Sequence, residues 1–495
     1  MTLRKLERLR HIRYFTNCLQ NLPQQYSTAD TTRLTLVHFC VQALDILGCL
    51  PDVNCCGDIE QNEVYIYREE IVEWIYGLQT LPTAIRKSSP SDECLDEGNG
   101  SSSSSVRYVG GGFKGGTYLG PLPNASDESK NDEKEWEQKQ QQQQQHPYDH
   151  SHLAMTYVAL CTLVTLGDDL SRVHKKAILQ TLQSLQKEDG SFEAISSNYC
   201  NGRATNPLTS DKEEDDCDLR FMYLAITVWY LLTDPTNNND KSSADNNENY
   251  PGINIKSATS YILSCISYDG SIGLTPGREG HGGSAFCGIA SLHLMGVLDD
   301  VLATRDKLAP WWKADLIRWC VMRQYSLPKQ NADNHHDDKK QNGYFIDDNS
   351  AGMQGRPNKL QDTCYSYWIG GTLHLLNESH LLDGWALREY VLTCQSPYGG
   401  FGKVVGAMPD VLHSFYSLAW LAMSKQQGCC EEEENEDEDV EVLSSENGER
   451  FGYDIETREQ VYHSIQRLSE LDCALGICAK RKIAFQKAAA MQYNG

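Results

Sequence analysis

The sequence predicts an all-α protein built from helical hairpins, with polar inserts between them. Apolar residues recur at helical spacing in several separate blocks, strand-like alternation is scarce, and a glycine-containing turn recurs between the helices. A chain of 495 residues with 40% apolar content is long enough to bury a large core. The predicted hairpins would either stack as an open array or close into a ring.

The helical blocks show the clearest periodicity. Behind Asp218, a candidate N-cap, apolar residues recur at helical intervals, namely Phe221, Leu224, Ala225, Val228 and Trp229. The stretches 365–376 and 412–420 repeat this spacing. Each of these stretches therefore predicts one amphipathic or buried helix.

A glycine-containing turn separates the predicted helices. It occurs at 188–192, 268–271, 341–344 and 397–401, around Gly190, Gly270, Gly343 and Gly400. These glycines are about 57 to 80 residues apart, and about 50 once the polar inserts are subtracted, which is a helical-hairpin period. If the turns lie at one end of successive hairpins, residues far apart in sequence gather at one rim.

Low-complexity segments interrupt the helical blocks. We expect a single domain over residues 1–480, with inserts near 87–105, 124–145, 201–216, 234–250, 328–354 and 425–451, and a C-terminal tail at 481–495. The inserts contain serine, glutamine, asparagine and acidic runs. Such runs cannot bury enough apolar surface to offset the cost of ordering, so they are predicted to be disordered loops.

The composition excludes several classes of function. The net charge is −24, with about 11 acidic residues in 431–449 alone, and no basic groove for nucleic acid is evident. No apolar run is long enough for stable membrane insertion. Eighteen cysteines, many of them in apolar helical runs, and the lack of a secretory leader predict reduced thiols in the cytoplasm. The last five residues do not have the Cys-a-a-X form of a prenylated terminus.

Asp362, Cys364 and His413 are the residue types of a metal site. A carboxylate, a thiolate and an imidazole all bind zinc, and three protein ligands leave a fourth position for a substrate, as in catalytic zinc sites. Residues two apart on a helix point about 200° away from each other. Asp362 must therefore precede its helix or lie at its start. Taken singly, these residues would also fit a helix cap, a buried thiol and a core histidine.

Cations and aromatic residues surround this set in the sequence. They are Arg356 and Lys359 before Asp362, Tyr365 and Trp368 after it, His281 among glycines, and Arg220 at a helix start. Such groups would supply hydrogen-bond donors for a diphosphate and aromatic surface for an apolar chain. Singly, the cations fit a solvated helix start and the aromatic residues fit a core.

Together these strings resemble the β subunits of protein prenyltransferases. The resemblance is carried by 281–290, 355–368 and 399–413, with shorter matches at 33–35, 74–76 and 168–172. It spans nearly all the helical blocks, and it is greatest to the type I geranylgeranyltransferases. It implies an α/α toroid with an apolar funnel, one catalytic zinc ion and a separate α subunit as partner.

The resemblance also assigns the site residues. It implies Asp362, Cys364 and His413 as zinc ligands. It implies Arg220, His281, Arg356, Lys359, Tyr365 and Lys403 at the diphosphate. It implies Thr35, Phe39, His152, Ala154, Phe221, Trp368 and Leu412 in the pocket for the isoprenoid and the peptide.

Two positions distinguish relatives within the family. Lys403 matches the type I geranylgeranyl enzymes, whereas farnesyl enzymes have Asp there and use magnesium, so magnesium is expected to be dispensable. Thr35 matches a small residue at the pocket floor, where farnesyl enzymes have Trp, and leaves volume for a longer lipid. The alternatives are a farnesyl or Rab-type β subunit, and a helical scaffold without turnover. A terpene cyclase lacks support, since no aspartate-rich or acidic protonation motif is placed in a helical repeat.

The implied activity is transfer of geranylgeranyl from its diphosphate to the cysteine of Cys-a-a-X proteins. The residue X would be mostly leucine, and the substrates would be small GTPases of the Rho, Rac and Rap type. The substrate thiolate would bind zinc as the fourth ligand before it attacks the lipid. One departure from the family pattern is the insertion from Phe345 to Gln354, next to the predicted site.

Overall fold

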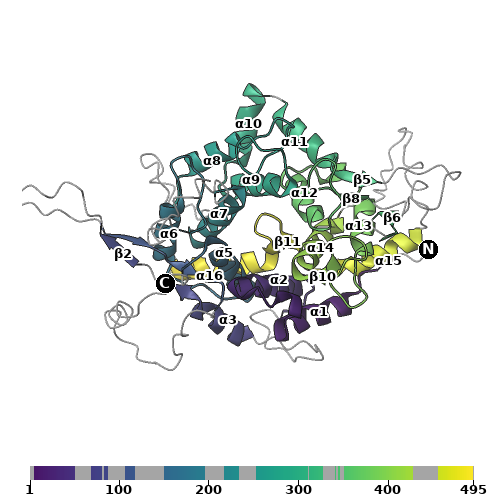
Figure 1. Cartoon of the computed structure of the whole chain (residues 1–495), viewed down its shortest axis with the longest axis horizontal. Helices are drawn as coiled ribbons and strands as arrows, with labels where there is room; N and C mark the ends of the chain where they lie inside the picture. Colours follow the sequence, from purple (N-terminus) through teal and green to yellow (C-terminus); the bar gives the residue numbers. More distant parts are fainter. Residues whose placement is uncertain are drawn as a thin grey trace, which may run out of the picture.

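The structure is a computed structural model that describes residues 5–50, 68–80, 83–86, 106–116, 150–195, 217–233, 252–309, 311–326, 340–341, 344–345, 351–426 and 455–493. Over these residues the chain is mainly helical. Figure 1 shows the helices arranged as a ring, with a second layer of helices around its outside. The prediction of an all-α fold of helical hairpins is confirmed, and the hairpins close rather than stack openly.

Six helices of the described chain form the inner wall of the ring. They are α2 (Arg33–Ile46), α5 (Leu153–Thr165), α7 (Leu219–Thr233), α9 (Gly282–Leu294), α12 (Cys364–Leu375) and α14 (Val411–Met423). Each inner helix contacts the next, and α14 contacts α2, so the ring closes. Most residues of α5 and α9 are buried around the whole helix, as expected where neighbours lie on every side.

The outer layer alternates with the inner wall along the chain. Its helices are α1 (Arg8–Gln20), α3 (Arg68–Gly77), α6 (Lys175–Leu185), α8 (Ile255–Ser264), α10 (Leu298–Leu308), α11 (Trp312–Val321) and α13 (Gly384–Thr393). Among them α6 is amphipathic and buries one stripe, at Ala177, Ile178, Thr181, Leu182 and Leu185. Each pair of successive inner helices is joined through the outer layer, by α10 and α11 together in the case of α9 and α12, and the inner helices all run in the same direction.

Short antiparallel strand pairs and single helical turns connect these helices. The pairs are β1 (Gln79–Thr80) with β4 (Gly112–Phe113), β2 (Thr83–Arg86) with β3 (Val106–Val109), β5 (Gln324–Ser326) with β8 (Ala351–Met353), β6 (Lys340–Gln341) with β7 (Tyr344–Phe345), β9 (Phe401–Gly402) with β10 (Pro409–Asp410), and β11 (Leu471–Asp472) with β12 (Ile477–Cys478). The 3-10 turns are η1 (Gln24–Tyr26), η2 (Asp30–Thr32), η6 (Ser379–Leu381) and η7 (Ser424–Gln426). Part of the predicted insertion before the site is ordered, since β8 pairs with β5 and leads into Gly355.

Hydrogen bonds join the first turns of the inner helices into a cycle. One amide at the start of each helix donates to the segment that precedes the next inner helix. Five of these bonds end on carbonyl oxygens, namely Leu34 to Gly115, Leu153 to Ala194, Leu219 to Leu274, Gly282 to Gly355, and Thr363 to Lys403. The sixth, from the Val411 amide, ends on the Tyr26 hydroxyl at 3.1 Å. The cycle aligns the six first turns at one end of the ring, which we call the rim.

The recurrent glycine turn has the same conformation in three places. Isolated bridges join Gln186 to Phe192, Ile266 to Ile272 and Gln395 to Phe401. Gly190 and Gly270 have φ of +95° and +91°, and their equivalent in the third turn is Gly399 at +93°, one residue before the Gly400 of the predicted repeat. Positive φ favours glycine at these positions. In the fourth predicted turn, Gly343 lies outside the described residues, and Gln341 pairs with Tyr344 between β6 and β7.

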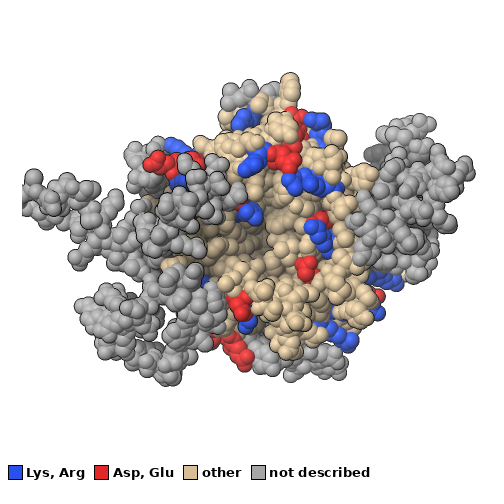
Figure 2. Space-filling view, in the orientation of Figure 1, with Lys and Arg blue, Asp and Glu red and all other residues tan. Residues whose placement is uncertain are grey.

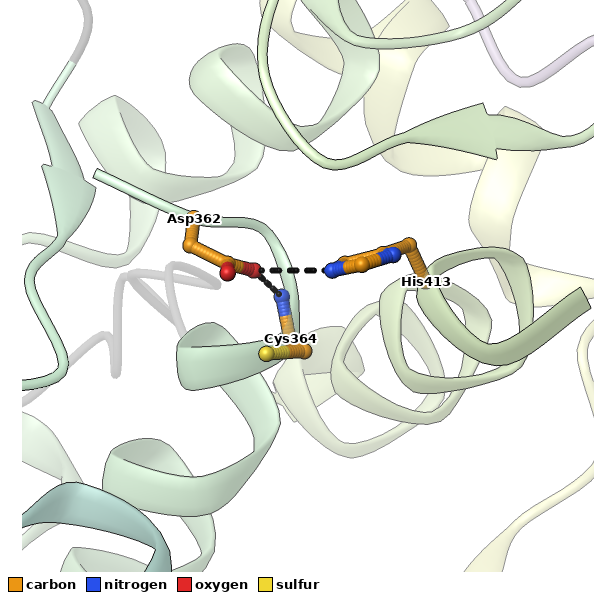
Figure 3. A group of neighbouring side chains, drawn as sticks. All are labelled: Asp362, Cys364 and His413. Atoms are coloured by element: carbon orange, nitrogen blue, oxygen red, sulfur yellow. Dashed lines mark hydrogen bonds and ion pairs between the residues drawn. The ribbon is translucent and has the colours of Figure 1, made fainter. Parts of the chain in front are cut away.

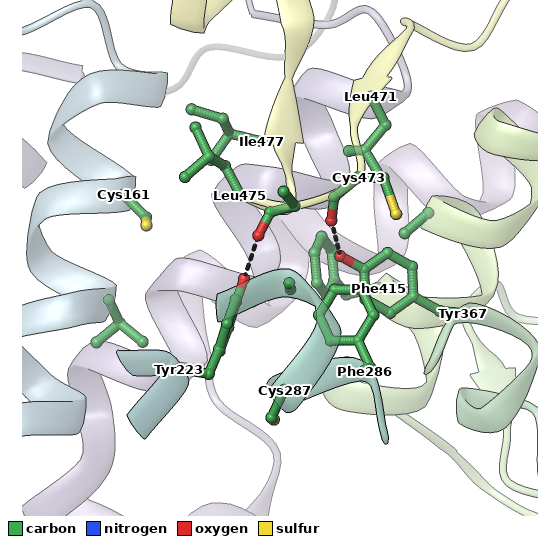
Figure 4. Close-up of a cluster of buried hydrophobic side chains, with 14 of the residues drawn as sticks. Cys161, Tyr223, Phe286, Cys287, Tyr367, Phe415, Leu471, Cys473, Leu475 and Ile477 are labelled. Atoms are coloured by element: carbon green, nitrogen blue, oxygen red, sulfur yellow. Dashed lines mark hydrogen bonds between the residues drawn. The ribbon is translucent and has the colours of Figure 1, made fainter. Parts of the chain in front are cut away.

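A C-terminal hairpin lies in the middle of the ring (Figure 1). It lies at the end opposite the rim, because the Ser469 amide just before it donates to the oxygen of Ile46, the last residue of α2. The main chain between β11 and β12 accepts hydrogen bonds from two inner helices. The Tyr223 hydroxyl donates to the Ala474 oxygen at 2.8 Å, and the Tyr367 hydroxyl donates to the Cys473 oxygen at 3.0 Å (Figure 4). Most of the segment 471–478 is buried. The hairpin therefore closes one end of the ring.

The residues after this hairpin are helical rather than a tail. The predicted tail at 481–495 lies mostly within α16 (Ala479–Tyr493), which follows α15 (Ile455–Gln466) and the hairpin. The Arg481 guanidinium is 4% exposed and forms an ion pair of 2.8 Å with Asp45 on α2, which is fully buried. A buried charge requires such a partner, so this pair fixes the start of α16 against the inner wall.

Two further expectations concern cysteines and membrane spans. The cysteines among the described residues are free, and most of them are buried, as predicted. In the same part of the chain no single helix has the length and apolarity to cross a membrane, although α9 together with Leu298–Arg305 passes that test as a pair bent by 111°. Most of the predicted inserts lie outside the described residues.

Candidate metal centre and its surroundings

Asp362, Cys364 and His413 meet at the rim. Each offers one ligand atom, and the three atoms all lie within 4.8 Å of one another. Figure 3 shows their side chains pointing toward a common point from α14 and from the start of α12. Asp362 and Cys364 are buried, and 16% of the His413 side chain is exposed. The structure therefore brings together the three residues that the sequence proposed as a ligand set.

The local backbone explains how Asp362 and Cys364 reach one point. Asp362 precedes α12, and Cys364 is the first residue of that helix, as their spacing requires. The Asp362 Oδ1 atom accepts a hydrogen bond of 2.9 Å from the Cys364 amide. The Asp362 amide donates to the Met353 oxygen, and the Thr363 amide donates to the Lys403 oxygen, both at 3.0 Å. These bonds fix the backbone on both sides of the carboxylate.

Asp410 holds the third member of the set. It caps α14, because its Oδ1 atom accepts a 2.9 Å bond from the His413 amide. Its Oδ2 atom lies 2.6 Å from Nδ1 of His413. This contact places a ring proton on Nδ1 and leaves Nε2 directed at Asp362, as in metal sites where a carboxylate orients the histidine. Asp410 is absent from the predicted site residues. Its signal in the sequence is an N-cap position three residues before His413.

Charge at this cluster favours a cation. Burial, and then the Asp362 carboxylate, raises the pKa of the Cys364 thiol well above its ordinary value. Burial alone would lower the pKa of His413, but its bonds to Asp362 and Asp410 outweigh burial and raise that pKa to about 9. Burial opposes ionisation of Asp362 as well, yet bonds with His413 and Cys364 lower its pKa. A divalent cation would favour the thiolate and replace these protons, so the donor set fits zinc.

His281 and Tyr365 form a second cluster on α9 and α12. The His281 Nε2 atom lies 3.0 Å from the Tyr365 hydroxyl, and its Nδ1 atom accepts a 3.1 Å bond from the Gly283 amide. Burial, followed by the charges of Arg356 and Arg220, lowers the pKa of His281 to about 4. The imidazole is therefore neutral near pH 7, and its proton lies on Nε2. It donates to the Tyr365 oxygen, so the hydroxyl proton is available for another acceptor.

Three of the predicted cations are paired with carboxylates. The pairs are Arg220 with Asp218 at 2.5 Å, Lys403 with Asp362 at 3.4 Å, and Arg356 with Glu279. The Arg220 and Lys403 side chains are 63% and 60% exposed, and Lys359 is also exposed. The carboxylates of Asp218 and Asp362 are buried, so in these two pairs only the cation faces solvent, whereas Arg356 and Glu279 are both open to solvent. Figure 2 shows charged side chains around the edge of the ring and mainly uncharged surface toward its middle.

Several predicted site residues occupy equivalent positions in the first turns of the inner helices. The caps His152, Asp218, His281 and Asp362 each accept a hydrogen bond from the amide two residues later. Cys364 comes one residue after the amide that its helix contributes to the cycle, and so do Thr35, Ala154, Arg220 and Leu412. His413 comes two residues after such an amide, and so do Phe221 and Tyr365. The ring thus gathers at one rim residues that the sequence spreads from 35 to 413.

Aromatic residues line the inner wall beyond the rim. The belt comprises His38 and Phe39 on α2, Tyr157 on α5, Tyr223 on α7, Phe286 on α9, Tyr367 and Trp368 on α12, and Phe415 and Tyr416 on α14. Successive ring centroids lie between 4.4 and 6.2 Å apart, and the belt closes through His38. It includes the predicted pocket residues Phe39 and Trp368. Tyr157, Trp368 and Tyr416 are half-buried, and the other members of the belt are buried. The part of the belt open to an apolar chain therefore lies on α5, α12 and α14.

Thr35 is half-buried in the first turn of α2. Its Oγ1 atom lies 3.7 Å from the Met155 sulfur on α5. Thr35 therefore lies on the side wall near the rim, at the end of the ring opposite the one that the C-terminal hairpin closes. A pocket that ends at Thr35, as predicted from the resemblance, would run across the ring to this wall.

Comparisons with known proteins agree with this architecture. The family model described as "Prenyltransferase alpha-alpha toroid domain" matches residues 6–477. The geranylgeranyl transferase type-1 subunit beta of Arabidopsis thaliana is 31% identical over 423 residues, which cover 85% of this chain and 86% of that protein. The Dictyostelium discoideum subunit of the same name is 29% identical over 415 residues, which cover 83% of this chain and 88% of that protein.

A solved structure supports the fold. The Candida albicans protein geranylgeranyltransferase-I complexed with GGPP matches with a TM-score of 0.58 and 22% sequence identity, over 98% of this chain and 99% of that chain. The toroid predicted from the resemblance is thus confirmed both by the closed ring and by these matches. The chain therefore belongs to the protein prenyltransferase β-subunit family, whose fold is the α/α toroid.

Proposed function

We propose that the chain is the catalytic β subunit of a type I protein geranylgeranyltransferase. It would transfer geranylgeranyl from geranylgeranyl diphosphate to the cysteine of Cys-a-a-X proteins, with X mostly leucine. The observation that carries the proposal is the convergence of Asp362, Cys364 and His413 at one rim, beside the His281–Tyr365 cluster. The similarity to type-1 β subunits over most of the chain supports the choice of lipid.

Asp362, Cys364 and His413 would hold one zinc ion, with Asp410 orienting His413 from behind. Three protein ligands leave a position for the substrate sulfur. Zinc would supply there the positive charge that lowers the pKa of a bound thiol. Asp410 bonds both the amide and the ring of His413, so it would hold this ligand in place before the substrate arrives, which reduces the reorganisation that binding requires.

The second cluster would bind the diphosphate. The Tyr365 hydroxyl would donate a hydrogen bond to a diphosphate oxygen, because neutral His281 already donates a hydrogen bond to the Tyr365 oxygen. Arg220, Arg356, Lys359 and Lys403 would add positive charge near the departing group. Lys403 is an ammonium next to Asp362, so it can neutralise the leaving diphosphate where a farnesyl enzyme uses magnesium. The aromatic belt would contact the lipid chain.

The proposed partners follow from the same assignment. The relatives are named as β subunits, which supports a heterodimer with an α subunit. The protein substrates would be small GTPases of the Rho, Rac and Rap type. The free cysteines of the described residues are compatible with a reducing compartment such as the cytoplasm.

The test is an assay of the chain co-expressed with a prenyltransferase α subunit. Geranylgeranyl and farnesyl diphosphate are compared as donors to a peptide ending in Cys-a-a-Leu and to one ending in Cys-a-a-Met, with and without magnesium. We expect the geranylgeranyl donor and the leucine peptide to give the higher kcat/KM without magnesium. Preference for farnesyl diphosphate with magnesium would favour the farnesyl alternative. Activity only on a Rab substrate would favour the Rab-type alternative, and absence of transfer would favour a scaffold.

A further inference from the structure

One bond of the rim cycle differs from the other five. In five inner helices, the bonded amide donates to a main-chain carbonyl, with N–O distances of 2.9 to 3.1 Å. At α14, the Val411 amide donates to the Tyr26 hydroxyl at 3.1 Å. A main-chain carbonyl is present whatever the residue, whereas a hydroxyl depends on the side chain. The start of α14 is therefore the one point of the cycle where the acceptor belongs to a side chain, so its bond can be removed without changing either main chain.

The start of α14 also carries half of the candidate metal site. Val411 lies between Asp410, which caps the helix, and His413. Asp410 bonds both the amide and the Nδ1 atom of His413, at 2.9 and 2.6 Å. Any displacement of the Val411 amide would move Asp410 and His413 together. The other two ligands belong to α12, whose start is anchored separately through Thr363 and Lys403.

Tyr26 is itself held firmly enough to act as an anchor. Tyr26 ends η1, where its amide donates to the Pro23 oxygen and its main-chain carbonyl oxygen accepts from the Ala29 amide, both at 2.9 Å. Its ring is half-buried against the core. The hydroxyl thus belongs to a side chain fixed on the segment before α2, and the Val411 amide that it accepts from belongs to α14.

We propose that Tyr26 is a positioning residue for the metal site. Its hydroxyl fixes the first turn of α14, and so sets the distance of His413 from Asp362 and Cys364. This inference rests on the proposed zinc-dependent function. In this inference Tyr26 positions His413, the metal ligand on α14, and has no role at the diphosphate cluster around His281 and Tyr365.

The test is Tyr26→Phe, which removes one oxygen atom and keeps the ring. The matched control is Tyr398→Phe, because Tyr398 is 84% exposed in the glycine turn at 397–401. Both variants and the unmodified chain are prepared as full chains with the α subunit. Zinc affinity is measured by competition with a chromophoric chelator, geranylgeranyl diphosphate affinity by fluorescence titration, and ligand geometry by the absorption spectrum of the cobalt-substituted protein.

We expect Tyr26→Phe to weaken zinc binding by about 10- to 100-fold, the range for residues that orient metal ligands. Its cobalt bands should shift, and its affinity for geranylgeranyl diphosphate should stay within about twofold. Tyr398→Phe should match the unmodified chain. Zinc affinity within about twofold of the unmodified chain, or equal losses of zinc and lipid affinity, would overturn the role of Tyr26. Absence of zinc from the unmodified chain would instead overturn the proposed function, and this inference with it.

Discussion

The Nε2 atom of His413, at the start of α14, lies 3.3 Å from Oδ1 of Asp362, just ahead of α12. Two neighbouring helices of the inner wall thus share one site. Asp362 also contacts Lys403 and the Cys364 amide, so a single carboxylate touches three groups of the proposed reaction. A metal ion bound here would join α12 to α14, and it would stabilise the folded chain by an amount that grows with the logarithm of the metal concentration divided by its dissociation constant.

Replacement of Cys364 by Ser should remove zinc. A serine hydroxyl does not ionise near neutral pH, so the site would lose its thiolate ligand. Zinc per chain, measured by inductively coupled plasma mass spectrometry after dialysis, should fall to about zero together with activity. Cys49→Ser is the control, because Cys49 contacts Arg8 and Leu47 instead of the site. Full zinc content and full activity in Cys364→Ser would contradict the ligand assignment.

Replacement of Asp410 by Asn should weaken zinc binding by about tenfold or more, the usual effect of losing a carboxylate behind a ligating histidine. The amide removes the negative charge that orients His413 and favours its bound form. The control is Asp383→Asn, since Asp383 caps α13 by accepting from the Ala386 amide at 2.9 Å. Chelator competition gives both affinities. Equal zinc affinity in the two variants would show that Asp410 acts only as a cap.

Replacement of Lys403 by Asp should make transfer depend on magnesium. The Lys403 ammonium lies 3.4 Å from Asp362, and its side chain is 60% exposed. In the proposed reaction this ammonium would contact the diphosphate. An aspartate would supply a magnesium ligand in place of a fixed positive charge. The measurement is kcat at increasing magnesium concentration, with Lys403→Arg as a control that keeps the charge. A variant with unchanged kcat and no response to magnesium would rule out this role.

Replacement of Thr35 by Trp should favour the shorter lipid. The indole would fill the wall between α2 and α5, where the Thr35 hydroxyl now contacts Met155. We expect the ratio of kcat/KM for geranylgeranyl over farnesyl diphosphate to fall by about tenfold or more, as expected when a pocket loses room for several methylenes. Thr35→Ser keeps a small side chain and should keep the ratio. An unchanged ratio in Thr35→Trp would place the end of the lipid elsewhere.

His11 should make the fold less stable in acid. It is buried, its Nδ1 atom accepts from the Gly400 amide and its Nε2 atom lies 2.9 Å from the Gln395 oxygen, as the neutral ring requires. Burial lowers the pKa of His11 to about 4 from an ordinary 6.5. Between these values the unfolded chain binds a proton that the folded chain does not. The free energy of unfolding therefore decreases as the pH is lowered from about 6.5 to about 4, by about 1.4 kcal/mol per pH unit for this group.

Denaturant unfolding at pH 7 and pH 5 checks this sign. From pH 7 to 5 the unmodified chain should lose about 2 kcal/mol more than His11→Asn, because asparagine does not titrate. His380→Asn replaces a histidine with a side chain 71% exposed, and it should behave like the unmodified chain. An equal loss in all three proteins would mean that other groups dominate the acid sensitivity.

The periodicity of the sequence predicted helices where the structure has α7, α12 and α14, because apolar spacing and caps such as Asp218 are local signals. The C-terminal segment was predicted poorly for the same reason. Residues 479–493 are rich in Lys, Arg and Ala, and nothing local indicates that Arg481 is buried against Asp45. Burial there depends on α2, which lies at the other end of the sequence.

The same contrast holds at the site. Asp362, Cys364 and His413 were predictable from residue type, spacing and resemblance, and Asp362 had to precede its helix for simple geometric reasons. Asp410 and Tyr26 were not predicted as site residues. Their roles depend on which atoms face Nδ1 of His413 and the Val411 amide, and a sequence does not state these distances.

The sequence by itself determined the building blocks of this protein: helical hairpins of similar length, caps at their starts, and a carboxylate, a thiol and an imidazole placed at helix starts. Periodicity left open whether the hairpins stack or close, and the toroid was expected only through the resemblance. The tertiary structure shows that α14 returns to α2 and that the first turns share one rim. The physical reason is that closure depends on packing between surfaces far apart in the chain, whereas periodicity and capping depend on neighbours a few residues away.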